Sequence, residues 1–350
     1  MSTTQSQRRL INWVALASGA LGLLLLGLLL FYPSPSTGLE QDPNSAEGGS
    51  GATSQGPATT GDTVRDEEHV LSGVDGCELG DAIVRIEGEQ DRQYKDLEIP
   101  AQTTFDATTA SWTAVSDYPI RLSGGSGVCW HGGIVAGTYP DTDSWDRMHD
   151  TAAFTATLPR FVGSGIRVHN YGDAINIVDN AEDFVLRQLH LTYIRDDCIE
   201  NDRLHAGVVE DSFLDGCYTA LSARPNPSDS ESDGEGDVWV IRRSLIRLEP
   251  MPTVYKGTAP GHGRFFKWDN DDRGPEIELH DNVFRADQPP NDGDLGLPEG
   301  YLGSCSGNVM VWLGDGAFPG TLPGCFTITT DAAVWERAVE AWTTEFGRYD

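Results

Sequence analysis

Three stretches of sequence decide the fold: GSGIRVHNYGDAINI at 163–177, FVLRQLHLTYIRDDCIEND at 184–202 and VVEDSFLDGCYTALS at 208–222. In each stretch, apolar and polar residues alternate with the period of two that is typical of β-strands. Similar runs follow at 238–248, 276–287 and 307–316, and one precedes them at 132–137. No helical pattern of useful length separates the runs, which argues against alternating strand and helix units.

The spacing of these runs indicates stacked coils. One apolar position was taken from each run, namely Ile134, Ile166, Leu189, Phe213, Leu245, Val283 and Val309. Several of the steps between them are in the low twenties, and the longer steps contain polar insertions. A single coil cannot bury its own inward side chains, but a second coil stacked about 4.8 Å away can. We therefore predict an all-β parallel β-helix (solenoid) over 69–350, with a β-sandwich as the alternative.

The C-terminal residues follow a different pattern. The sequence DAAVWERAVEAWTTEF at 331–346 places Ala333, Val334, Ala338, Val339 and Trp342 at helical spacing. Asp331 is a suitable N-cap for such a helix. We predict a C-terminal capping helix that covers the last coil, whose open edge would otherwise pair with other strands.

The N-terminal part predicts a membrane anchor. Residues 10–32 carry no charge, and as a helix they span about 35 Å, enough for a hydrocarbon core of about 30 Å. Arg8 and Arg9 precede this segment, so residues 1–9 are expected in the cytoplasm and the rest outside it. A cleaved signal peptide is the alternative, but the apolar run is long and lacks a small-residue cleavage pattern.

Residues 33–68 are rich in Pro, Ser, Gly and Thr and predict a flexible linker between the membrane helix and an exoplasmic domain at 69–350. The expected localisation is a single-pass membrane protein with its C-terminal domain in the periplasm or outside the cell. The formal net charge is -30, from 54 acidic and 24 basic residues. Such a charge argues against nucleic acid as a partner, because phosphates would be repelled.

Six cysteines follow the linker, as expected for three disulfides in an exported domain. Short and similar separations favour the local pairs Cys198–Cys217 and Cys305–Cys325, which leaves Cys77 for Cys129. The step between the first two cysteines is shorter than the step between the strands around them, so a turn must absorb the difference. Buried free thiols are the alternative.

The sequence GDAINI, followed by RDDCIEND and later by GHG, resembles the right-handed parallel β-helix proteins of the pectin-lyase-like superfamily. Within that superfamily it is similar to polygalacturonase-type glycoside hydrolases. The resemblance implies catalytic roles for Asp173, which matches the first family Asp by position, and for Asp196 and Asp197, which match an Asp pair.

The resemblance is partial. The family His lies about one coil after the Asp pair, but the corresponding coil here reads LDGCYTALS, without a histidine. The GHG around His262 comes much later than Asp197, inside an insertion, and Arg264 and Lys267 follow as a loose echo of a basic substrate clamp. Together with Glu200, these three residues are candidate substrate-binding residues.

The residues support the same site by an independent argument. Coil stacking places Asp173 and Asp197 one above the other, and their carboxylates can splay to about 6.5–9.5 Å, the separation of an inverting glycosidase. Repulsion between them would raise one pKa and retain a proton for general acid catalysis. The alternative is that these are turn residues, which bond to their own backbone at coil corners.

Other sequence features give weaker evidence of a functional site. The loop from Asp229 to Val240 has oxygens at alternating positions, as calcium loops do, but lacks the final Glu, and 269–272 is similar. A solvated acidic loop is the alternative, so no cofactor is expected, although calcium is possible. Aromatic residues that could stack on sugars, or belong to the core, are Trp130, Trp145, Phe265, Phe266 and Trp268.

Together these observations predict a membrane-anchored cell-envelope protein that acts on or binds carbohydrate. Its expected partner is a polysaccharide or glycan, and its possible activity is glycoside hydrolysis by the stacked aspartates. A non-catalytic surface scaffold or adhesin is the alternative, for which the missing histidine is the main argument.

Overall fold

The computed structural model describes residues 83–225, 234–253, 260–268, 273–291, 294–296 and 300–347. The predicted membrane helix at 10–32, the linker at 33–68 and Cys77 lie outside the described residues, as do most of the two candidate calcium loops. No helix among the described residues is both long and apolar enough to cross a membrane. The described residues belong to one compact unit.

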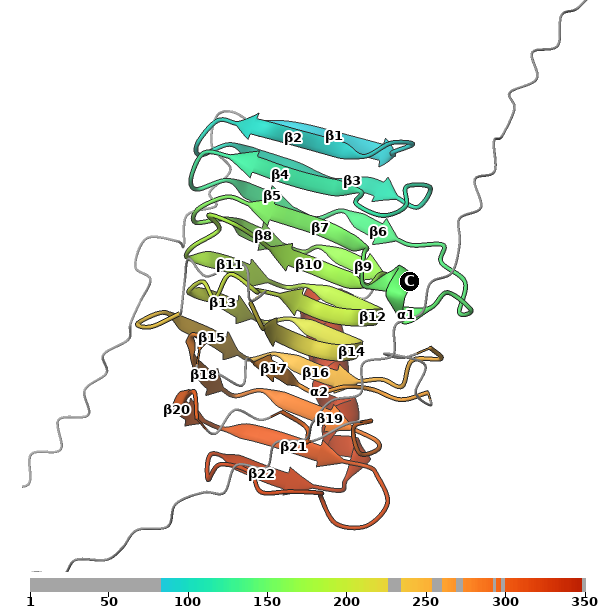
Figure 1. Ribbon diagram of the computed structural model, residues 1–350, viewed down its shortest axis with the longest axis vertical. Coiled ribbons are helices and arrows are strands. Elements are labelled where there is room, and N and C mark those ends of the chain that lie inside the picture. Colours follow the sequence, from blue (N-terminus) through green and yellow to red (C-terminus); the bar gives the residue numbers. More distant parts are fainter. Residues whose placement is uncertain are drawn as a thin grey trace, which may run out of the picture. The chain divides into compact units, whose positions relative to one another are not determined.

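The chain winds into a column of stacked coils (Figure 1). Every pairing between its strands is parallel and joins one coil to the next. This arrangement confirms a mostly β, all-parallel architecture that is consistent with the predicted solenoid, and it rules out the antiparallel layers of a β-sandwich. The strands form three ladders along the column, which we call ladders A, B and C.

The first ladder comes first in each coil. Ladder A comprises β1 (Ile83–Glu89), β3 (Thr104–Trp112), β5 (Cys129–His131), β8 (Val162–Ser164), β11 (Phe184–Arg187), β13 (Gly207–Glu210), β15 (Val238–Arg242), β18 (Glu276–His280) and β20 (Leu302–Ser306).

The second ladder starts from the end of β3. Ladder B continues with β6 (Ile134–Ala136), β9 (Arg167–His169), the first halves of β12 (His190–Glu200) and β14 (Phe213–Ala223), β16 (Leu245–Leu248), β19 (Val283–Ala286), β21 (Asn308–Trp312) and β22 (Phe326–Thr329).

The third ladder positions the candidate site. Ladder C comprises β2 (Tyr94–Ile99), β4 (Ile120–Gly124), β7 (Ala152–Thr157), β10 (Asp173–Ile177), the second halves of β12 and β14, and β17 (Phe266–Trp268).

The predicted repeat agrees closely with the observed register. Phe213, Leu245, Val283 and Val309 stack directly on one another in ladder B. The column continues upward through His190 and Arg167, so the positions chosen as Leu189 and Ile166 are each one residue early. The inward side chains of successive coils form one continuous core, in which Trp130, Phe154, Ile175, Ile199 and Leu221 are fully buried.

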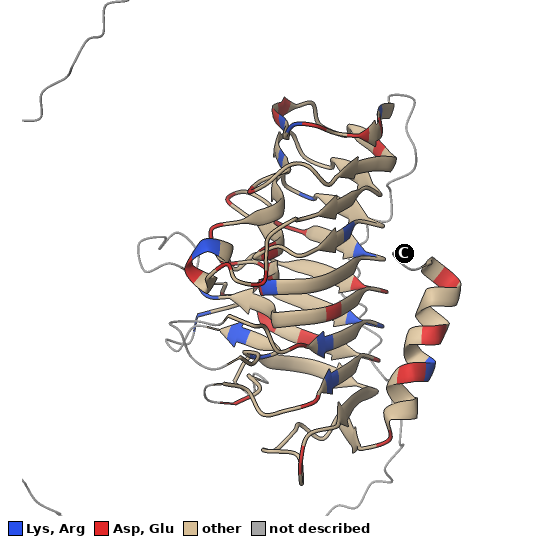
Figure 2. Ribbon diagram, turned by 90° about the vertical axis from the view of Figure 1, so that its right-hand side faces the viewer, with Lys and Arg blue, Asp and Glu red and all other residues tan. Residues whose placement is uncertain are grey.

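The helix α2 (Ala332–Phe346) begins after Asp331, whose carboxylate accepts the backbone N–H of Ala333 at 3.0 Å as predicted. It does not cover the end of the column but runs along its side (Figure 2). The reason lies in ladder B, whose outward residues are apolar. Trp335 and Trp342 bury themselves against Phe213, Leu245 and Val311 in a separate cluster.

The predicted disulfides Cys198–Cys217 and Cys305–Cys325 are present, with Cα–Cα distances of 5.6 and 5.7 Å. For the first pair, the irregularity lies within β12. Ile194 pairs with Cys217 and Asp197 with Thr219, so an extra residue lies between these pairs, where β12 passes from ladder B to ladder C. At this corner Cys198 lies over Cys217.

Candidate active site

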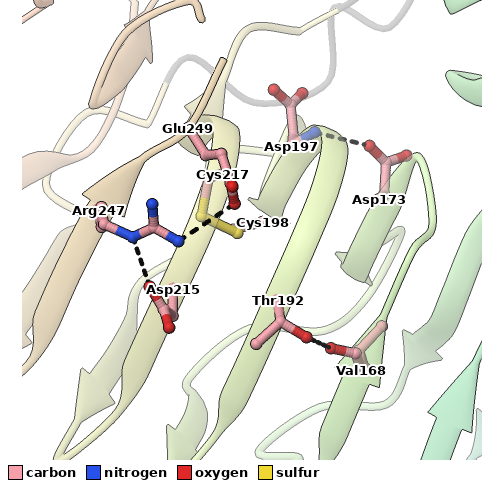
Figure 3. The surroundings of a disulfide bond; sticks show 9 residues. All are labelled: Val168, Asp173, Thr192, Asp197, Cys198, Asp215, Cys217, Arg247 and Glu249. Atoms are coloured by element: carbon pink, nitrogen blue, oxygen red, sulfur yellow. Dashed lines mark hydrogen bonds and ion pairs between the residues drawn. A yellow bond between two sulfur atoms is a disulfide. The ribbon is translucent and has the colours of Figure 1, made fainter. Parts of the chain in front are cut away.

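Stacking brings Asp173 and Asp197 together on ladder C. Ile175 pairs with Ile199, and in this register Asp197 lies one coil beyond Asp173. The backbone N–H of Asp197 donates to the Asp173 carboxylate at 3.2 Å (Figure 3). Both residues are buried, with exposed fractions of 4% and 2%.

A third acid completes the group. One carboxylate oxygen from each of Asp173, Asp197 and Glu200 lies within 4.8 Å of the others. At least one oxygen of each acid thus lies nearer to the others than the roughly 6.5–9.5 Å expected for the carboxyl groups of an inverting glycosidase, and nearer to the value of about 5 Å that is typical of retaining enzymes. Glu200 is half-buried, and it accepts a long hydrogen bond from Asn176, its neighbour in register, at 3.4 Å.

Lys267 supplies a positive charge from two coils away. In ladder C, Glu200 pairs with Ser222 and Ser222 pairs with Lys267. The Lys267 ammonium lies 2.5 Å from Oδ2 of Asp197, whose side chain is only 3% exposed, while that of Lys267 is 25% exposed. The other oxygen of Asp197, Oδ1, is buried and has no hydrogen-bond partner among the described residues. The group formed by Asp173, Asp196, Asp197, Glu200, Asp202 and Lys267 is called the acid cluster below.

Asp196 faces a covering segment. The short helix α1 (Trp145–Met148) begins after Ser144, and the indole N–H of Trp145 donates to the Asp196 carboxylate at 3.3 Å. Gly172 permits this close approach, because a Cβ there would lie 1.9 Å from the Met148 carbonyl oxygen. The Arg195 guanidinium fixes the same segment by donating to the carbonyl oxygen of Asp143 at 2.6 Å.

The electrostatics of the acid cluster favour bound protons. Burial, reinforced by neighbouring carboxylates, raises the pKa of Asp173 well above its usual range and that of Asp196 to about 8. Burial and the nearby Asp202 raise the pKa of Glu200 to about 7. Burial alone would lower the pKa of Lys267, but the carboxylates of Asp197, Asp196 and Asp202 outweigh it, and the net pKa is raised. Lys267 thus stays charged, while several acids hold protons near neutral pH.

The remaining basic candidates are placed elsewhere. His262 is fully buried, and its two ring nitrogens lie 3.0 Å from the carbonyl oxygens of Gly263 and Gln288. Burial lowers the pKa of its imidazole. Arg264 precedes β17 and pairs its carbonyl oxygen with the N–H of Ala220. No ion pair to the acid cluster is recorded for either side chain within the described residues.

The five aromatic candidates also fall into two groups, core residues and one residue beside Asp196. Trp130, Phe265, Phe266 and Trp268 are buried in the continuous core. Trp145 is half-buried and lies beside Asp196. Of the five, Trp145 therefore contacts an acid of the cluster through its side chain, by the hydrogen bond to Asp196.

Sequence reasoning missed Asp202. Its carboxylate accepts the Ser222 hydroxyl and the Arg224 N–H, both at 2.8 Å, and its pKa is raised by burial. The residue ends the stretch RDDCIEND, whose density of acidic residues was the available sequence signal. Two surface hollows of about 370 and 540 Å³ lie elsewhere, beside Leu295 and Tyr301 respectively.

Comparison of the chain with protein-family models, with curated proteins and with solved structures finds no match.

Proposed function

We propose that this protein is a glycoside hydrolase that acts on a neutral glycan through the acid cluster. One observation carries the proposal: a carboxylate held by an ammonium group, Asp197, lies beside a half-buried acid whose pKa is raised to about 7, Glu200. Carboxyl groups whose environments differ in this way are the usual means of assigning an acid and a base to one site.

The roles follow from exposure and charge. Glu200, the more accessible acid, donates its proton to the leaving glycosidic oxygen. Asp197, whose carboxylate is paired with the Lys267 ammonium, attacks the anomeric carbon as the bond to that oxygen breaks. Glu200 then takes a proton from the water that releases the sugar. The oxygen spacing of 4.8 Å or less supports this two-step, retaining course. Asp173, which accepts the N–H of Asp197, is a positioning residue.

The charge of the site favours a neutral substrate. The acid cluster contains five acids and one lysine, and the whole chain carries a net charge of -30. A polyuronate would be repelled by both, because the cluster has few cations to neutralise it. No calcium-dependent step is needed in this scheme, because Lys267 already balances Asp197.

The wider setting is part of the proposal. The partial resemblance to right-handed pectin-lyase-like proteins supports carbohydrate as the substrate class. The uncharged segment at 10–32, with Arg8 and Arg9 before it, supports a single membrane anchor and a domain outside the cytoplasm. The glycan would then be a component of the cell envelope or its surroundings.

A second candidate is a non-catalytic surface scaffold. It is favoured by the low exposure of Asp173 and Asp197, at 4% and 2%, which restricts access to the two acids. In that case the acid cluster would be a structural feature of the column, and Glu200 would have no substrate to protonate.

The two candidates are separated by an activity screen on the full-length chain in detergent. Release of reducing ends is measured from neutral glucans, xylans, galactans and mannans, with polygalacturonate as the acidic comparison. We expect release from a neutral glycan and a loss of at least about 100-fold in Glu200→Gln and Asp197→Asn, as for removal of an acid catalyst. Glu278→Gln, on ladder A, is the matched control and should retain activity. Glycan binding without release, unchanged in Glu200→Gln, would support the scaffold instead.

A further inference from the structure

A histidine lies between two serines on the last two strands of ladder A. His280 ends β18, and Ser304 and Ser306 belong to β20, which pairs with it. The Ser306 hydroxyl lies 3.0 Å from Nδ1 of His280, and the Ser304 hydroxyl lies 3.1 Å from Nε2. Both serines are exposed, so a substrate in solution can reach them. None of these residues belongs to the acid cluster.

A carboxylate indicates which ring nitrogen carries the proton. Oε2 of Glu278, two residues before His280 in β18, lies 3.7 Å from Nε2 of the ring. An ionised carboxylate only accepts hydrogen bonds, so it favours the N–H on Nε2 and leaves the lone pair on Nδ1. Ser306 is then the serine whose proton the ring can take. Nucleophile, base and orienting acid thus follow one another as in Ser–His–acid sites, whose contacts are often loose before substrate binds.

The residue after Ser306 supplies a backbone donor. At the corner between ladders A and B, six residues with positive φ each donate their N–H to a carbonyl of the next coil, namely Gly132, Gly165, Gln188, Asp211, Arg243 and Asp281. Gly307, with a φ of 65°, takes the next such corner, but β20 pairs only with β18, so no further strand of ladder A lies beyond it in the described part of the chain. No acceptor for the Gly307 N–H is recorded there. A free N–H directly after a nucleophilic serine can stabilise the oxyanion of a tetrahedral intermediate.

The strand that carries the two serines is held in place. Cys305 lies between them and forms the disulfide with Cys325. The carbonyl oxygen of Ser306 accepts the N–H of Asp281 at 2.9 Å, which keeps the serine in register with His280. The hydroxyl and the imidazole are therefore positioned before any substrate arrives, as efficient catalysis requires.

We propose that Ser306 and His280, oriented by Glu278, form a serine esterase site that is separate from the acid cluster. Oγ of Ser306 attacks the carbonyl carbon of an ester while its proton passes to Nδ1 of His280. The proton then passes to the departing alkoxide, and the acyl group stays on Ser306. Water attacks this acyl group and gives a proton to His280, which returns it to Oγ as the carboxylic acid leaves.

The surroundings favour a small, uncharged acyl group. Glu276 and Glu278 on β18 and the neighbouring Asp281 are negative and would repel an anionic one. Neither of the two surface hollows is lined by Ser306 or His280, so a long acyl chain would lack a hollow beside the nucleophile. The substrate class that fits an exposed serine of this kind is an acetyl ester of a larger alcohol.

The nucleophile is identified by covalent labelling of the full-length chain in detergent. A fluorophosphonate probe forms a P–O bond with an activated serine and loses fluoride, and mass spectrometry of the digest locates the label. We expect the label on Ser306 and its absence in His280→Gln. A label on Ser304, or no labelled serine, would overturn the proposal.

Turnover of 4-nitrophenyl acetate measures the activity. Ser306→Ala and His280→Gln should each lower kcat/KM by about 100-fold, as for the loss of a nucleophile or a general base. Glu278→Gln should lower kcat by about tenfold with KM unchanged, and Glu278→Asp should restore part of that loss. An equal effect on KM would show that Glu278 does not act through the imidazole.

A matched control comes from the same row of ladder A. Ser164 stacks beside His131 as Ser306 does beside His280. It is only 9% exposed, however, and the N–H of the following Gly165 is bonded to the Arg187 carbonyl at 3.0 Å. Ser164→Ala should therefore leave ester hydrolysis unchanged. Equal rates in Ser164→Ala and Ser306→Ala would contradict the site, whatever the outcome of the glycan assay.

Discussion

Two groups of acidic residues are balanced in different ways, and part of each group lies beside the Cys198–Cys217 disulfide (Figure 3). In the first group, at ladder B and its corner with ladder A, arginines match the acids almost one to one. The arginines are Arg242, Arg243, Arg247 and Arg285, and their acids are Glu210, Asp211, Asp215, Glu249 and Asp287. In the acid cluster, by contrast, the only ion pair recorded among the described residues joins Lys267 to Asp197.

The difference shows that coil stacking does not itself require unbalanced acids. Where successive coils carry acids on ladder B, the next coil supplies an arginine in register, as Arg247 does for Asp215. At ladder C the acids are instead grouped together, and burial raises the pKa values of Asp173, Asp196, Glu200 and Asp202, which costs stability. Sites that give up stability in this way are often functional.

The largest expected effect comes from removing the cation of the acid cluster. Lys267→Met leaves the carboxylate of Asp197 buried without an ion-pair partner, and such a change costs about 3–5 kcal/mol of folding free energy. Arg247→Met should cost about 1 kcal/mol, because more exposed pairs contribute less, and its partners Asp215 and Glu249 are 14% and 31% exposed. Urea unfolding at pH 8 measures both.

The same pair of variants has a second readout. At pH 5 the surrounding acids bind protons, so the loss in Lys267→Met should shrink relative to pH 8. Equal losses for the two variants at both pH values would contradict the contrast between the groups.

The two disulfides provide a second test of this comparison, because only Cys198–Cys217 adjoins the acid cluster. Removing either by a double Cys→Ser change should cost about 3 kcal/mol, because the closed loops are similar in length, with sequence separations of 19 and 20. Only the loss of Cys198–Cys217 should also reduce glycan hydrolysis, by more than tenfold, since that bond holds the bulge before Asp197. Urea unfolding and the reducing-end assay measure the two effects. An equal loss of activity without Cys305–Cys325 would speak against this local role.

The stability of the fold should fall as pH rises. Asp196 and Glu200 have pKa values raised to about 8 and about 7 in the folded state, above the ordinary values of 3.8 and 4.5. The folded state therefore binds more protons than the unfolded state between these limits. The stabilisation is complete below about pH 4 and is lost as pH rises through 7 to 8, by at most about 1.4 kcal/mol per pH unit for each group.

Thermal unfolding between pH 5 and pH 8.5 measures this dependence. Glu200→Gln should flatten the fall between pH 5 and pH 7, because its amide does not titrate. Glu210→Gln, in the arginine-paired group, is the control and should leave the slope of the wild-type chain intact. A wild-type Tm that rises over this range would contradict the assignment.

The smallest effect concerns the cover of the acid cluster. The indole N–H of Trp145 lowers the pKa of Asp196, against the larger effect of burial. Trp145→Phe removes this hydrogen bond, at a cost of about 1 kcal/mol, and should shift the loss of stability with pH upward. Trp342→Phe removes an indole hydrogen bond to the Asp211 carbonyl at the corner between ladders A and B and should leave the pH midpoint unchanged. Matching shifts in the two variants would contradict a specific role for Trp145.

Much of the column could be predicted from the sequence, because each strand shows a local alternation of apolar and polar residues that recurs from coil to coil. Phe213, Leu245, Val283 and Val309 were placed in register even across steps that contain polar insertions. The stacking of Asp173 and Asp197 followed from the short coil between them. The spacing of their oxygens did not, because it depends on the bulge in β12 and on burial.

Other parts of the site could not be predicted, because they depend on contacts between residues that an insertion separates in the sequence. Phe266 pairs with Leu221 although a long insertion separates them, so the sequence could not show that Lys267 reaches Asp197. The GHG motif drew attention to His262, whose ring is held by backbone carbonyls instead. The helix α2 was predicted from its spacing, but its side-on position follows from the apolar outward row of ladder B, which was visible in the sequence as Phe213 and Leu245.

The most direct test of the account is whether Glu200 retains its proton near neutral pH. Infrared difference spectroscopy of the carboxylic acid C=O band follows this in the full-length chain without any substrate. We expect a band that disappears with a midpoint near pH 7 and is absent from Glu200→Gln. If that band is lost by pH 5.5, or persists unchanged in Glu200→Gln, the acid cluster does not hold the proton that the proposed chemistry needs.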